Sequence, residues 1–91
     1  MDKRKDKRTF EKIRNSIILA INNDQRTIND IASKADVNWK TVSNHLIYLL
    51  GMKIVYEVFS SPYVKIYALT DEGKNICNAL MKTKRGKRSR Q

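Results

Sequence analysis

The sequence predicts one small domain that is mainly α-helical and carries a single short β-hairpin. Apolar residues recur at intervals of three and four in four segments, which indicates amphipathic helices. Two stretches rich in β-branched and aromatic residues, 54–59 and 63–69, flank the turn at residues 60–62, which indicates a hairpin. The 91 residues can bury one core of modest stability. We expect a basic arm over residues 1–8, the folded domain over 9–81 and a basic tail over 82–91.

The first helix is expected to begin after Thr9, which can serve as its N-cap, and to end near Asn22. Its expected core stripe consists of Phe10, Ile13, Ile17 and Ile21. Ile18 and Leu19 lie off this stripe, and exposed aliphatic residues of this kind often mark a contact between subunits. We therefore expect both of them at a dimer interface.

A pair of helices joined by a tight turn is expected over residues 27–50. Residues 25–27 can form a very short strand, and Thr27 can cap the first helix of the pair. The inner face of that helix has helical spacing and consists of Ile28, Ile31, Ala32 and Ala35. Asp36 stands where the chain must turn left-handed, which Asp tolerates at some cost. Asn38 can cap the second helix, expected over about 38–50.

The second helix of the pair has a polar face opposite its apolar one. Its inner side consists of Val42, Leu46 and Leu49. At about 100° per residue, its outer side holds Lys40, Thr41, Asn44 and Tyr48. An Asn side chain can read adenine and a Lys can reach guanine, so such a helix suits the major groove of DNA. The alternative is a merely solvated helix face.

Four further residues of this helix belong to the expected DNA-binding set: Asn38, Trp39, Ser43 and His45. Ser43 and His45 flank the outer face and are expected to contact phosphate, although His45 could instead be a capped residue at the boundary of the core. Trp39 is expected to cover the small core as a lid. The alternative for Trp39 is stacking on a sugar or a base edge.

The hairpin turns at residues 60–62, where Pro62 cannot join a strand ladder. No Arg or Lys stands at its tip to enter a minor groove, so we expect it to touch only the DNA backbone. The residues expected to do so are Ser60, Ser61, Tyr63 and Lys65.

The last helix is expected to begin after Thr70, with Asp71 and Glu72 in its first turn favouring the helix dipole. Ile76 and Leu80 lie on its core side. The residues that diverge from that side and are expected at the dimer interface are Cys77 and Met81. We expect the helix to fray beyond about Lys84.

Most of the net charge of +10 lies at the two ends of the sequence. Between them, residues 1–8 and 82–91 hold eleven Lys and Arg residues but only two acidic residues, whereas the body is almost neutral. Basic arms can bind phosphates and release counterions, and the alternative is a solubilising role. The arm residues expected on phosphates are Lys3, Arg4, Lys5, Lys7, Arg8, Lys84, Arg85, Lys87, Arg88 and Arg90.

Composition argues against several classes of protein. One Cys and one His cannot form a zinc cluster, and no paired carboxylates, nucleophile motif or glycine-rich phosphate loop indicates an enzyme. The N-terminus lacks a secretory signal, and no apolar run approaches the roughly 20 residues that span a bilayer. We expect a cytoplasmic protein, associated with the nucleoid or with the host cytoplasm if viral, that needs no metal or cofactor.

The expected order of helix, helix, turn, helix, hairpin and helix is that of a winged helix-turn-helix. Residues 30–32 (DIA) and 41–49 (TVSNHLIYL) resemble the "IA…TVSxHLxxL" pattern of ArsR- and MarR-type bacterial and archaeal regulators. Residues 67–73 (YALTDEG) are similar to their "YxLTxxG" join between wing and final helix. The resemblance covers residues 25–80 and implies DNA binding.

The sequence departs from these families in two respects. Lys53 stands where they often have Gly, so either the helix ends half a turn sooner or Lys53 adopts a strained conformation. The chain also lacks the Cys and His clusters of metal-sensing ArsR members and any evident effector pocket.

We therefore expect a homodimeric transcriptional regulator that binds double-stranded DNA sequence-specifically. The alternatives are a winged-helix module for protein interactions and a sequence-neutral DNA-coating or RNA-binding protein.

Overall fold

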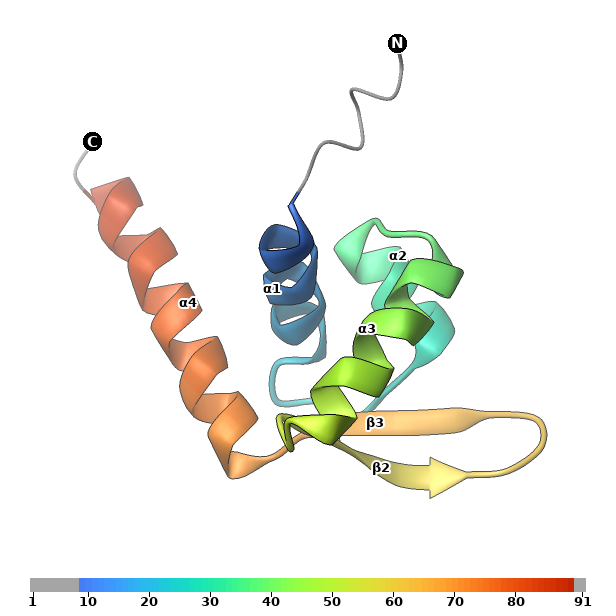
Figure 1. Cartoon of the computed structure of the whole chain (residues 1–91). Coiled ribbons are helices and arrows are strands. Elements are labelled where there is room, and N and C mark those ends of the chain that lie inside the picture. The colour runs from blue at the N-terminus through green and yellow to red at the C-terminus, as the bar shows by residue number, and fades with distance from the viewer. Residues whose placement is uncertain (1–8, 90–91) are drawn as a thin grey trace, which may run out of the picture.

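The computed structural model describes residues 9–89, with side chains described for residues 9–82. Four helices and three strands follow one another in the order expected from the sequence (Figure 1). They are α1 (Phe10–Ile21), β1 (Arg26–Thr27), α2 (Ile28–Ala35), α3 (Trp39–Gly51), β2 (Val55–Ser60), β3 (Lys65–Leu69) and α4 (Asp71–Ser89). This is the predicted winged helix-turn-helix, with α3 in front of α1 and α2 and the β2–β3 hairpin extending below them as the wing (Figure 1).

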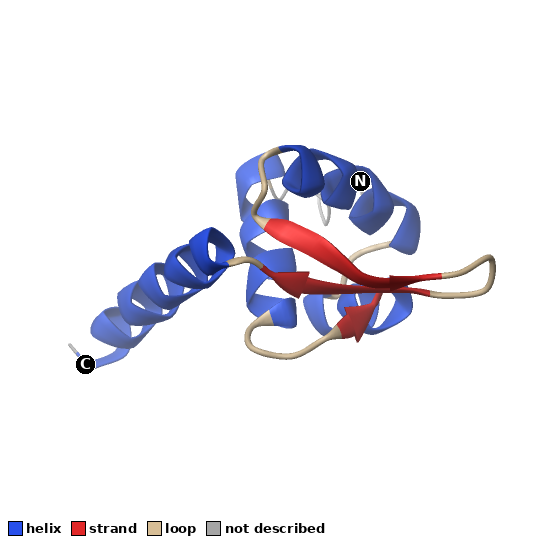
Figure 2. Cartoon of the chain, turned by 90° about the horizontal axis from the view of Figure 1, so that it is seen from below, coloured by secondary structure: helices blue, strands red, loops and turns tan. Residues whose placement is uncertain are grey.

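The three strands form one antiparallel sheet in the order β1-β3-β2. The short strand β1 pairs Arg26 with Tyr67 and thereby ties the helix-turn-helix to the inner strand of the wing. Strand β2 lies at the outer edge, and its register against β3 shifts between Glu57 and Phe59, leaving Val58 as a bulge. Figure 2 shows that the hairpin continues beyond the helical body.

Four polar side chains begin the helices as the sequence predicts. The Oγ1 atoms of Thr9 and Thr27 accept hydrogen bonds at 3.1 Å from N–H groups three residues later, and the Asn38 Oδ1 atom accepts one at 2.8 Å from the N–H of Lys40. The Thr70 Oγ1 accepts from the N–H of Gly73 and donates to the Lys53 carbonyl at 2.7 Å. Thr70 therefore joins the start of α4 to the base of the wing.

Two residues other than glycine make left-handed turns where the sequence indicated them. Asp36 has φ 58° and ψ 50° and ends α2. Lys53 has φ 61°, whereas α3 runs on to Gly51, so the strained alternative for Lys53 is confirmed. The N–H groups of Lys53 and Ile54 donate to the carbonyls of Leu50 and Leu49, which holds this turn against the end of α3.

Helix α1 also buries residues outside the single stripe predicted from the sequence. Ile18 and Cys77 were expected at a dimer interface, but only 1% and 2% of their surface is exposed. The physical reason is that α1 packs against α2 on one side and α4 on another, so residues off the predicted stripe are also covered. Phe10 was expected in the core, but it is 56% exposed because it lies at the first position of α1.

The last helix is longer than the sequence indicated. Its backbone is helical to Ser89, past the expected fraying point at Lys84, and it leans away from α1 (Figure 1). No helix in the part of the chain described here combines the length and the apolar character needed to cross a membrane.

Candidate nucleic-acid interface

Helix α3 separates its apolar and polar residues as predicted. Its buried side consists of Val42, His45, Leu46 and Leu49. On the opposite side, Lys40 and Asn44 are exposed, while Thr41 and Ser43 are half-buried at its margins and 41% of the Tyr48 surface is exposed. We call this side the outer face of α3.

One residue of the outer face was missed by sequence reasoning. Ile47 is 67% exposed and lies between Asn44 and Gly51 along the same face. The sequence contained the information needed to find Ile47, because positions 40, 44, 47 and 51 follow helical spacing directly opposite the buried side. The predicted set included only residue types that can form hydrogen bonds or stack, so Ile47 was left out.

His45 does not lie on the outer face. It is 4% exposed, its ring stacks on the Phe10 ring at a centroid distance of 4.3 Å, and its buried Nδ1 has no hydrogen-bond partner among the described residues. Burial, and secondarily the charge of Arg14, lowers the pKa of His45 below its ordinary value. The prediction that His45 contacts phosphate was therefore wrong. Its position matches the alternative, a residue at the boundary of the core.

Arg14 brings a cation to the edge of α3 that sequence reasoning also missed. Its guanidinium carbon lies 5.5 Å from the Phe10 ring centroid and 5.6 Å from that of Tyr48. Phe10 and Tyr48 meet edge to face at 5.8 Å. Arg14 follows Phe10 by one helical turn, so both side chains leave α1 on the same side. This cluster of Phe10, Arg14, His45 and Tyr48 holds the start of α1 against α3.

A groove separates the start of α3 from the wing. Its volume is about 240 Å³, and its lining includes Trp39 together with Ser61, Tyr63 and Lys65 of the wing and the start of α2. Trp39 is 60% exposed, so the expected lid over the core was wrong. The structure thus brings Trp39 together with three of the four predicted wing residues, while Ser60 lies exposed at the end of β2.

Two of the polar residues predicted to contact DNA use their side-chain oxygens for hydrogen bonds within the protein. The Ser61 Oγ accepts hydrogen bonds at 3.1 Å from the N–H groups of Tyr63 and Val64 and shapes the tip of the wing. The Asn38 Oδ1 caps α3, as described above. Of the predicted wing residues that line the groove, Tyr63, which is 94% exposed, and the exposed Lys65 therefore remain available to a partner.

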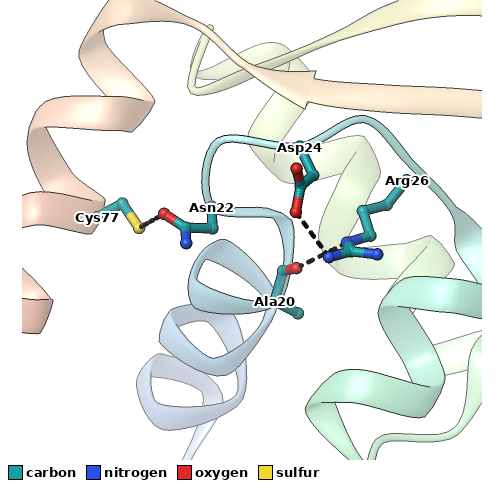
Figure 3. Close-up of polar contacts among 5 residues, drawn as sticks. All are labelled: Ala20, Asn22, Asp24, Arg26 and Cys77. Carbon is teal, nitrogen blue, oxygen red and sulfur yellow. Dashed lines mark hydrogen bonds and ion pairs between the residues drawn. The ribbon is translucent and has the colours of Figure 1, made fainter.

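Two of the residues predicted for dimerisation, Cys77 and Met81, lie together on α4 beside the end of α1. The Cys77 Sγ donates to the Asn22 Oδ1 at 3.5 Å (Figure 3) and lies 3.9 Å from the Met81 Sδ. Burial raises the pKa of the Cys77 thiol. Leu19 and Met81 are half-buried and pack against the core, so Leu19 is not the exposed aliphatic residue that the sequence suggested.

Arg26 beside this junction has a structural role. Its Nε donates to the Ala20 carbonyl at 3.2 Å, and its guanidinium pairs with Asp24 at 2.8 Å (Figure 3). Both bonds fasten the turn between α1 and β1.

Six of the predicted arm residues lie outside the described residues: Lys3, Arg4, Lys5, Lys7, Arg8 and Arg90. Four more lie in the part of α4 whose side chains are not described: Lys84, Arg85, Lys87 and Arg88. Within residues 9–82, no three His, Cys, Asp or Glu side chains lie together in a way that could hold a metal ion.

Solved structures share this fold. Lactococcus lactis ZitR, as the apo C30AH42A mutant, has a TM-score of 0.78 and 15% identity, with 88% of this chain and 62% of that chain covered. The MarR family transcriptional regulator SPO1453 from Silicibacter pomeroyi has a TM-score of 0.71 and 20% identity, covering 86% and 57%. A complex of Staphylococcus aureus MepR with DNA has a TM-score of 0.66 and 26% identity, covering 80% and 64%. The chain spans about three fifths of the length of these proteins.

Sequence comparison gives the family. No curated relative matches the chain at a significant level. The family model for bacterial regulatory proteins of the arsR family matches residues 11–57, which run from α1 through the first half of β2. The family match and the MarR-type folds confirm the resemblance and support a DNA-binding regulator of transcription, a class whose members are not enzymes. The chain belongs to the arsR family of bacterial regulatory proteins.

Proposed function

We propose that this regulator recognises a specific sequence in double-stranded DNA by placing α3 in the major groove. The observation that carries the proposal is the outer face of α3, where Lys40 and Asn44 project into solvent with no described partner for their side chains. Asn44 is suited to an adenine edge, and Lys40 can reach a guanine or a phosphate. The DNA complex of MepR, which shares the fold, lends support from a related architecture.

The groove between α3 and the wing suits the sugar–phosphate backbone beside the major groove. Trp39 and Tyr63 offer flat apolar surfaces to the sugars, and Lys65 supplies a positive charge to a phosphate. The wing then fixes the position of α3 on the duplex without reading bases.

The basic arms supply affinity that the body lacks. The cluster of Phe10, Arg14, His45 and Tyr48 fixes the start of α1 beside α3, so the arm over residues 1–8 begins next to the proposed DNA surface. If about six arm residues contact phosphate, log K should fall against log salt with a slope of about −5.

We further propose that the protein acts as a homodimer whose contacts come from α1 and α4. Ile18 and Cys77 are buried within the chain, so the partner would meet Leu19, Met81 and the outer side of α4. Two-fold symmetry would place the half-sites of the DNA about one helical turn apart. Sedimentation at tens of micromolar tests this assembly, and a monomer there would contradict it.

Selection of bound sequences from random duplex DNA tests the central proposal. The full chain should enrich one motif, and Lys40→Ala and Asn44→Ala should each weaken binding to it. Losing one good base contact typically costs about 1–3 kcal/mol. Lys34→Ala and Asn23→Ala are matched controls, because both residues are exposed and lie outside α3, the wing and α4.

Replacing the arm Lys and Arg residues by Gln separates the rival functions. This change retains the chain length, and α4 should still run to Ser89 because Gln is a good helix former. A motif that survives with weaker binding supports the regulator, whereas equal binding to unrelated duplexes that disappears with the arm charges would indicate a sequence-neutral coating protein.

A specific observation favours an interaction module as the second candidate function. Strand β2 exposes Tyr56, Val58 and Phe59, and an exposed apolar edge strand is a common docking surface for proteins. This function predicts that Lys40→Ala and Asn44→Ala leave DNA affinity unchanged.

A further inference from the structure

We propose that Ile47 is a specificity-determining residue that reads the C5-methyl group of a thymine. This inference rests on the proposed placement of α3 in the major groove. It assigns to the outer face an apolar contact in addition to the hydrogen bonds proposed for Asn44 and Lys40.

Ile47 occupies the middle of the outer face with little protein around it. It is 67% exposed and belongs neither to the core nor to the partly buried apolar residues that pack against it. Tyr48, its neighbour in sequence, is held by Phe10 and Arg14, whereas Ile47 is not among the apolar residues that pack against the core.

The neighbours of Ile47 leave room for a close approach. Asn44 precedes it by one turn and carries a short polar side chain. Gly51 follows by one turn, and no atom lies within 4 Å of the position that a Cβ there would occupy. The surface after Ile47 is therefore open, so a base edge could reach the Ile47 side chain.

The residue type is unfavourable unless a partner covers it. A β-branched residue is a poorer helix former than Ala, Leu or Lys, and its exposed apolar surface gains nothing from burial in the free protein. The same branching restricts χ1 in a helix, so the side chain is rigid before it binds and loses little freedom on contact. Ile47 is thus suited to an apolar group at a fixed position.

The major groove offers one apolar group on its base edges, the C5-methyl of thymine. The other base-edge groups are hydrogen-bond donors and acceptors, which Ile47 cannot satisfy. Because Ile47 and Asn44 share one face a turn apart, we expect the thymine to lie close to the base that Asn44 reads. The preferred site should therefore contain a thymine that no polar residue of α3 explains.

Single deoxyuridine substitutions test this contact, because uracil lacks only the methyl group. The probe is the duplex enriched by the full chain, with each thymine replaced in turn. At one thymine per half-site, affinity of the unmodified protein should fall about four-fold, the effect of losing contact with one methylene-sized group. Ile47→Ala should bind the thymine and uracil duplexes equally well at that position.

Controls distinguish the contact from other effects. Ile47→Val keeps the β-branch and should retain part of the preference for thymine. Neither variant should lose thermal stability, since Ile47 is mostly exposed and lies outside the core, and Ile47→Ala should gain slightly because Ala is the better helix former. The inference is overturned if uracil is tolerated at every position, or if Ile47→Ala keeps the full preference for thymine. If the full chain enriches no motif, the proposed function fails and this inference fails with it; loss of thymine reading alone leaves the proposed function intact.

Discussion

Phe10 stacks on His45 with their ring centroids 4.3 Å apart and their planes 29° from parallel. The contact joins the first residue of α1 to the middle of α3, and it covers a histidine whose Nδ1 has no described hydrogen-bond partner. It therefore links the start of α1 to the helix proposed to read DNA.

Stability should fall as the pH drops below 6.5. The pKa of His45 is lowered in the folded protein, so the unfolded chain takes up a proton first, near the ordinary value of 6.5. The stability contributed by neutral His45 is fully present above pH 6.5 and is lost as the pH falls through the folded-state pKa. Urea unfolding between pH 8 and pH 5 measures the loss. His45→Leu should weaken this dependence, and an unchanged dependence in that variant would rule out His45 as its source.

Removing the Phe10 ring should cost stability and DNA affinity together. Phe10→Ala loses an aromatic stack, worth about 1 kcal/mol beyond burial, and releases the segment from which the basic arm begins. Phe59→Ala is the matched control for stability, since Phe59 is 51% exposed against 56% for Phe10 and makes no described ring contact. Denaturant midpoints and binding at low salt measure both effects. Equal loss of stability in the two variants would mean that the stack contributes nothing.

Glycine at position 53 should stabilise the protein. Lys53 has φ 61°, and a residue with a Cβ pays about 1–2 kcal/mol for a left-handed conformation. Lys53→Gly removes that cost but gives the unfolded chain more freedom, so we expect a net gain of about 0.5–1 kcal/mol. Lys53→Ala keeps the Cβ and should gain little, which separates backbone strain from loss of the charge. Thermal melts that rank Ala equal to Gly would refute the role of strain.

Two glycines should respond in opposite directions to the same substitution. In Gly73→Ala the new Cβ would collide with the Ile54 carbonyl oxygen, where α4 starts against the base of the wing. A loss of about 2 kcal/mol or more is expected, because backbone on both sides must shift. Gly51→Ala meets no atom within 4 Å and has a helical conformation, so it should gain up to about 1 kcal/mol. Equilibrium unfolding of the pair tests the packing around both sites.

The order of elements and their starting residues could be predicted because those signals are local. Thr9, Thr27 and Asn38 cap helices through atoms two or three residues away, and Asp36 and Lys53 mark turns by their own backbone. Both partners of such a contact lie within a few residues of each other, so a short stretch of sequence is enough to predict it.

Burial could be predicted less well because it depends on elements distant in sequence. Periodicity along α1 identified a single stripe, but α1 also packs against α4, and this contact buries Ile18 of α1 and Cys77 of α4. His45 has the residue type of a surface contact, yet Phe10 lies over it. For the candidate site, Lys40 and Asn44 followed from the helical face, whereas the meeting of Trp39 with Tyr63 required the position of the wing.

The bulge at Val58 has a consequence for how the protein behaves at high concentration. Among the described strands, β2 pairs only with β3, so its other side presents free backbone N–H and C=O groups next to aromatic side chains. Such a strand is a template for fibre growth when its row of groups is regular. The register shift between Glu57 and Phe59 breaks that row after a few residues, so a second chain cannot zip along its full length. We therefore expect this irregularity of one residue to disfavour amyloid-like self-association of the wing while leaving its surface open to solvent.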